Sequence, residues 1–105
     1  MTGVGDISTE VVLFEPSSVG RKGPLGGGKY FACPFVVGGE AFDCRLLIEG
    51  RTLALGQMHH VDIVFLQWGL VAPTLKEGTR FALLQGCTPI AEGVVTSVNR
   101  PPRAV

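Results

Sequence analysis

Residues 23–29, with the sequence GPLGGGK, nearly match a phosphate-binding P-loop, in which backbone amides and a lysine surround phosphate groups. A P-loop also needs a Ser or Thr after the lysine, to hold magnesium, and a helix that directs its amides at the phosphate. Here Tyr30 follows Lys29, and residues 30–35 have a composition typical of a strand. We therefore predict that this loop binds neither GTP nor ATP.

His59, His60 and Asp62 are the residues that most suggest a metal site or an acid–base pair. Adjacent residues of a strand point to opposite faces, so His59 and His60 cannot ligate one ion from a regular strand. His60 and Asp62 would share a face at a separation of about 7 Å. This spacing favours a surface pair over a catalytic site.

The chain has three cysteines, Cys33, Cys44 and Cys87, which are widely separated and show no Cys-x-x-Cys spacing. This pattern indicates neither a disulfide framework nor a zinc site, and we expect three reduced and mostly buried thiols. There is no Gly-x-Ser-x-Gly motif, and no histidine can be assigned as a partner of Cys87. We predict no enzymatic activity, no metal and no cofactor. A small hydrolase that uses Cys87 or the histidines is the remaining catalytic alternative.

The composition is that of a single compact domain of 105 residues, of which 46% are hydrophobic. Nine basic and nine acidic residues give a net charge of zero, whereas domains that bind nucleic acid are commonly basic. The only candidate basic cluster is Arg21, Lys22 and Lys29. The first residues lack a signal-peptide pattern, and the longest apolar run, residues 61–73, is too short to cross a bilayer. We expect a cytoplasmic protein without membrane contact.

Fifteen glycines and seven prolines separate short segments in which apolar and polar residues alternate, which is typical of a small β-sandwich or β-barrel. Val61, Ile63 and Phe65 should share a buried face, as should Phe81 and Leu83. Pro34 cannot donate to a strand ladder and would place its strand at an edge. We expect loose termini at 1–9 and 99–105, and strands at 10–14, 30–37, 41–48, 52–55, 59–66, 80–85 and 90–98.

The strongest pattern is the hairpin of residues 75–98, with LKEGTRFAL at 75–83 and EGVVTSV at 92–98. It resembles the closing hairpin of the third domain of elongation factor Tu, where an acidic-Gly-x-Arg-Phe-Ala segment precedes Gly-x-Gly-Val-Val. Weaker similarity extends to residues 10–14, 20–24, 53–56 and 61–64. The resemblance implies an all-β fold, a six- or seven-stranded antiparallel barrel, here as a free-standing domain too short to include the family's GTPase.

In elongation factor Tu this domain contacts the T-stem of aminoacyl-tRNA and the nucleotide exchange factor. The positions that match its tRNA contacts are Val71 and the run Leu84, Gln85, Gly86 and Cys87, and only Gly86 keeps the family residue. At the positions of Val71 and Leu84 the family has a lysine and an arginine. Their replacement by apolar residues removes contacts to phosphate.

The resemblance therefore implies a non-catalytic module that binds a protein partner. The alternative is a module related to translation that binds RNA or tRNA through Arg21, Lys22 and Lys29. An exposed apolar patch around Val71 and Leu84 would favour the protein partner, and a contiguous basic patch would favour RNA.

Overall fold

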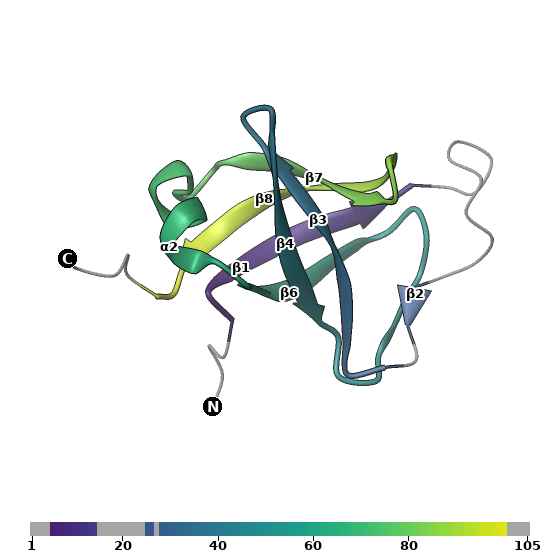
Figure 1. Cartoon of the computed structure of the whole chain (residues 1–105). Helices are drawn as coiled ribbons and strands as arrows, with labels where there is room; N and C mark the ends of the chain where they lie inside the picture. Colours follow the sequence, from purple (N-terminus) through teal and green to yellow (C-terminus); the bar gives the residue numbers. More distant parts are fainter. Residues whose placement is uncertain (1–4, 15–24, 27, 101–105) are drawn as a thin grey trace.

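The computed structural model describes residues 5–14, 25–26 and 28–100, which form a closed barrel of six antiparallel strands (Figure 1). Around the barrel the hydrogen-bonded order is β1-β6-β4-β3-β7-β8, and β8 pairs with β1 to close it. The expected all-β fold with a six-stranded antiparallel barrel is confirmed. The barrel strands are β1 (Ile7–Leu13), β3 (Tyr30–Val37), β4 (Glu40–Leu47), β6 (Met58–Phe65), β7 (Arg80–Gln85) and β8 (Thr88–Val98).

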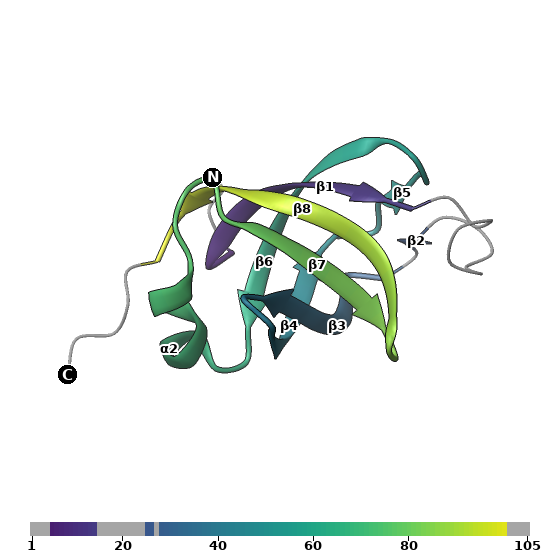
Figure 2. The ribbon, with the colours of Figure 1, turned by 90° about the horizontal axis from the view of Figure 1, so that it is seen from above.

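Two small features lie at opposite ends of the barrel (Figures 1 and 2). At one end β2 (Leu25–Gly26) pairs with β5 (Thr52–Leu53). At the other, the helix α2 (Trp68–Val71) and a 3₁₀ turn (Ala72–Thr74) connect β6 to β7. The sequence did not predict α2, because four residues are too few to show a helical period. No helix in the described part of the chain is long and apolar enough to cross a membrane.

The barrel interior is filled by the inward-facing residues of the alternating strands. Phe35 is fully buried, and its ring stacks on Phe81 at a centroid distance of 4.3 Å and meets the edge of Phe65 at 4.8 Å. Val61 and Ile63 from β6 and Leu83 from β7 are also buried. The predicted inward faces of these two strands are therefore confirmed.

The β3–β4 hairpin turns at Gly38 and Gly39, whose φ angles of 59° and 83° are those of a tight hairpin turn. Pro34 was predicted to mark an edge strand, but β3 is paired on both sides. The prediction fails for the strand as a whole, although the ladder with β7 includes only Phe35 and Val36. Pro34 lies just outside that ladder, where its missing N–H costs no strand hydrogen bond.

In β8 the simple alternation of buried and exposed residues is interrupted. The register against β7 shifts between Leu83, which faces Ala91, and Leu84, which faces Pro89. Ile90 is the extra residue of this bulge, and both Ile90 and Ala91 are buried. A period-2 pattern cannot place two consecutive residues in the core, so the sequence did not predict this bulge.

The parts of the chain next to both termini are held in the barrel by Asp6, which is 2% exposed. Its Oδ2 accepts a hydrogen bond from the amide of Phe65 at 2.8 Å, and its Oδ1 lies 2.9 Å from Nη1 of Arg100. The amide of Asn99 donates to the carbonyl oxygen of Asp6 at 2.9 Å. The prediction of loose termini is therefore wrong for residues 5–9 and 99–100, while residues 1–4 and 101–105 lie outside the described residues.

Candidate functional site

The basic residues that the sequence suggested for RNA binding are described only in part. Arg21 and Lys22 lie outside the described residues, as does most of the glycine-rich loop. Lys29 is exposed and is followed directly by β3. The strand predicted after Lys29 is thus confirmed.

Val71 and Leu84 do not form a common surface. Val71 is 0% exposed, because α2 turns Trp68 and Val71 into the core, so the prediction that Val71 lies on a binding surface is wrong. Leu84 is half-buried near the end of β7, and Gln85 and Gly86 after it are exposed. Figure 1 shows this end of β7 far from α2.

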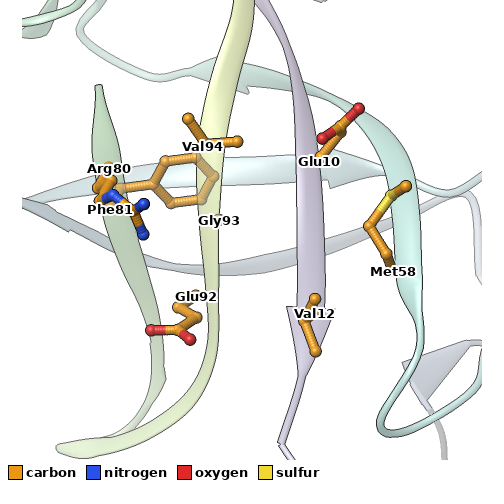
Figure 3. A pocket seen from close by; sticks show the side chains of 8 residues that line it. All are labelled: Glu10, Val12, Met58, Arg80, Phe81, Glu92, Gly93 and Val94. Atoms are coloured by element: carbon orange, nitrogen blue, oxygen red, sulfur yellow. The ribbon is translucent and has the colours of Figure 1, made fainter. Parts of the chain in front are cut away.

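The outer wall formed by β7, β8, β1 and β6 carries a shallow groove of about 260 Å³ (Figure 3). Gly93 and Phe81, which face each other in the β7–β8 register, both line it. A Cβ at Gly93 would lie 2.6 Å from Cζ of Phe81 and 2.7 Å from the carbonyl oxygen of Glu10. The close packing of β7, β8 and β1 therefore requires glycine here. The groove is lined by Glu10, Val12, Met58, Arg80, Phe81, Glu92, Gly93 and Val94.

The charged side chains of this groove are solvated. Glu10 lies 3.9 Å from Nδ1 of His60, with side-chain exposures of 39% and 75%, which makes a weak surface contact. Arg80 and Glu92 are also exposed.

The histidines suggested as a possible site are engaged separately. Nε2 of His59 lies 2.9 Å from the carbonyl oxygen of Ala54, whereas His60 faces Glu10 on the outer surface. Asp62 accepts a hydrogen bond of 3.0 Å from the hydroxyl of Ser8. Among the described residues, no group of three or more His, Cys, Asp or Glu side chains is placed to hold a metal ion.

Two of the three cysteines face each other across the β3–β4 hairpin, an arrangement that the sequence analysis missed. Cys33 and Cys44 are opposite in the register, their sulfur atoms are 4.0 Å apart, and both are buried free thiols. The hydrogen bond with Cys33, followed by burial, raises the pKa of the Cys44 thiol far above its ordinary value. Cys44 is therefore a poor nucleophile. The expectation of mostly buried thiols is confirmed by Cys33 and Cys44, whereas Cys87 is exposed.

The Cys33–Cys44 contact could have been inferred from the sequence. A two-residue turn at Gly38 and Gly39 places Val37 opposite Glu40, and each step along the hairpin then fixes the next pair. Counting four pairs on from Val37 and Glu40 reaches Cys33 and Cys44.

An apolar corner lies where β6 leaves the barrel and α2 begins. Leu66 and Leu70 are 58% and 63% exposed, two of the largest exposures of hydrophobic side chains in the described residues. They line one hollow of about 400 Å³ together with Ala41, Phe42, Asp43 and Gln67. We call this hollow, with these six residues, the apolar corner. The sequence did not predict this corner, because β4 and α2 are brought together only by folding.

A second surface lies at the start of β3. Tyr30 is 49% exposed, and the guanidinium carbon of Arg45 stands 4.8 Å from the centre of its ring. Lys29, Tyr30, Leu47 and Glu49 line an adjacent hollow. An exposed aromatic ring beside cations is a feature of surfaces that stack nucleic-acid bases, although Glu49 lowers the local positive charge.

No model of a known protein family matches this sequence, and no curated protein matches it significantly. The resemblance to the third domain of elongation factor Tu therefore stays a prediction. The closed six-stranded barrel is the architecture which that resemblance implies.

Proposed function

We propose that this barrel is a non-catalytic binding module that recognises another protein through the apolar corner. The observation that carries the proposal is the exposure of Leu66 and Leu70, 58% and 63%, side by side around one hollow. Neighbouring apolar side chains on a surface are characteristic of interaction sites. Covering the exposed half of each leucine would contribute about 1 kcal/mol.

The protein-binding proposal keeps the class of function that the sequence suggested and changes the residues that perform it. Val71 is in the core and supplies packing, whereas Leu70, its neighbour in α2, supplies the exposed apolar surface. A relationship to the third domain of elongation factor Tu would be compatible with this role, since that domain also contacts a protein.

A capture experiment tests the proposal. The protein and its variant Leu66→Glu/Leu70→Glu are immobilised and exposed to cell lysate, with and without nuclease. We expect a protein that is retained after nuclease treatment and lost with the double variant. Met58→Glu is the matched control, because Met58 is 50% exposed and lines the groove of the outer wall, at the other end of β6 from Leu66. Equal capture by the wild type and the double variant would contradict the proposal.

A second candidate function is RNA binding at Tyr30, Arg45 and Lys29, favoured by the stacking of Arg45 on the exposed ring of Tyr30. Titration of aminoacyl-tRNA at about 150 mM salt separates the two candidates, because phosphate contacts weaken steeply with salt. We expect weak or no binding. Tight binding that Tyr30→Ala reduces tenfold or more would favour the RNA-binding module.

A further inference from the structure

We infer that the apolar corner binds an extended, apolar peptide segment of a partner protein, which carries a basic residue and adds as a strand to the free edge of β4. This inference rests on the proposed function and specifies the chemistry of the partner. It depends on the backbone of β4 and on the side chains around it.

The edge of β4 is open next to the hairpin turn. The ladder between β4 and β6 runs from Cys44, opposite Phe65, to Leu47, opposite Asp62. Beyond it, the amide of Leu66 donates a hydrogen bond of 3.2 Å to the carbonyl oxygen of Asp43, and the chain then turns into α2. The part of β4 nearer the turn, from Glu40 to Phe42, extends past the end of this ladder. Figure 1 shows the tip of the β3–β4 hairpin standing beyond the other strands.

The backbone of Ala41 points into this open edge. The carbonyl oxygen of Asp43 faces Leu66, on the side away from β3. In an antiparallel strand, residues two positions apart direct their backbone groups to the same side. The amide and carbonyl of Ala41 therefore face the side that β6 has left, where Ala41 lines the apolar corner. An unpaired backbone donor and acceptor on a strand edge can pair with the backbone of an extended peptide.

The side chains around the edge define what kind of peptide fits. Leu66, Leu70 and the half-buried Phe42 provide apolar contacts for alternate side chains of an added strand. Asp43 lines the hollow and Glu40 is exposed at the same edge, so a Lys or Arg of the peptide would find a carboxylate there.

The carboxylates argue against a second copy of this chain as the occupant. In an antiparallel pairing of two β4 edges with Ala41 opposite Ala41, the Glu40 side chains of the two copies would be diagonal neighbours on one face. Like charges at such a contact are unfavourable. A peptide that carries Lys or Arg would meet these carboxylates with an opposite charge, without this repulsion.

The first step of the test is a selection from a display library of random nine-residue peptides, with the Leu70→Glu variant used for counter-selection. We expect enriched peptides that alternate apolar residues, contain Lys or Arg and have no central proline. If no peptide is enriched over the counter-selected variant, the inference is overturned.

The second step uses a synthetic form of an enriched peptide and an analogue N-methylated at alternate residues. On adding the peptide we expect amide NMR shifts confined to residues 41–43 and 66–70, and at least tenfold slower hydrogen exchange at the amide of Ala41. The N-methylated analogue should bind at least tenfold more weakly, because it cannot donate to β4. Equal binding by the analogue would overturn strand addition.

The third step compares variants of the protein. Ala41→Pro removes the outward-facing amide and should weaken peptide binding at least tenfold, as should Leu70→Glu, whereas Met58→Glu should leave it unchanged. Pro34 in the facing strand shows that this hairpin accepts a proline whose nitrogen faces away from its partner strand. Amide spectra confirm that each variant is folded, and the N-methylated peptide tests the same hydrogen bonds without altering the protein.

The results separate this inference from the proposed function. A protein captured from lysate by both the wild type and Ala41→Pro, but lost with Leu66→Glu/Leu70→Glu, would leave the protein-binding function standing and overturn strand addition. If every one of these variants captures protein as well as the wild type does, the proposed function itself is contradicted. Shifts at residues 41–43 that depend on protein concentration without peptide would identify a second copy as the occupant and overturn the inference.

Discussion

The groove on the outer wall and the apolar corner are both hollows on one small barrel, but they offer a partner different groups. The wall is a continuous sheet in which β1 is paired with β6 and β8 along most of its length. Its groove therefore lies over paired strands and offers side chains, among them the charged Glu10, Arg80 and Glu92. At the corner β6 ends while β4 continues, so the backbone of Ala41 and the exposed leucines lie together. Strand pairing stabilises the wall, whereas at the corner the pairing of β4 with β6 stops before the end of β4.

The largest effect should come from removing the aromatic side chain beneath the wall. Phe81→Ala deletes a ring that stacks on Phe35 at 4.3 Å. We expect a loss of about 3–5 kcal/mol in the free energy of unfolding, measured by denaturant titration, because a buried cavity forms. A loss below about 1 kcal/mol would mean that this ring does not support the core.

The glycine of the wall should be the next most sensitive position. A Cβ at Gly93 would meet the carbonyl oxygen of Glu10 at 2.7 Å, and a backbone atom cannot move aside as a flexible side chain does. Gly93→Ala should therefore lower the free energy of unfolding by about 1–3 kcal/mol.

Gly69→Ala in α2 is the matched control for this substitution. A Cβ at Gly69 would meet nothing within 4 Å, so the same change should leave stability unchanged or raise it by about 0.5–1 kcal/mol. Similar losses at both glycines would contradict the contrast between wall and corner.

Cys44, the residue at which β4 begins to pair with β6, should make stability depend on pH under alkaline conditions. The hydrogen bond with Cys33 and burial raise its pKa in the folded state, whereas the unfolded thiol ionises near its ordinary value of 9.0. Above that pH only the unfolded state loses this proton. The contribution of the thiol to stability is complete below pH 9.0 and is lost progressively as the pH rises above it.

Urea titrations between pH 7 and 11 measure this dependence, and Cys44→Ala is the control. The variant will be less stable at every pH, so the comparison concerns the slope against pH. We expect a shallower slope for the variant. Equal slopes would show that ionisation of Cys44 does not contribute to the pH dependence of stability.

The smallest effect on stability should occur at the corner. Leu70→Ala removes a side chain that is 63% exposed, so the free energy of unfolding should change by no more than about 0.5 kcal/mol. The same substitution should weaken any partner bound at the corner. A loss of stability above about 2 kcal/mol would indicate that Leu70 belongs to the core and is not a binding residue.

Local alternation in the sequence was sufficient to locate most strands and to orient several of them. The inward faces of Val61, Ile63 and Phe65, and of Phe81 and Leu83, follow from the period of two in an extended chain, which needs no knowledge of the partner strands. The turn at Gly38 and Gly39 was also predictable from local sequence, because positive φ angles favour glycine.

The candidate site depended on contacts between distant parts of the chain. Whether Leu66 and Leu70 are exposed depends on where β6 ends relative to β4, and the pairing of Cys44 with Phe65 sets that end. A four-residue helix has no detectable period, so its first and last residues, Trp68 and Val71, could not be assigned to the core from sequence. The sequence thus determined which residues form strands and which faces are apolar. The closure of the barrel decided which apolar residues stay in water, because burial depends on neighbours that are far apart in the chain.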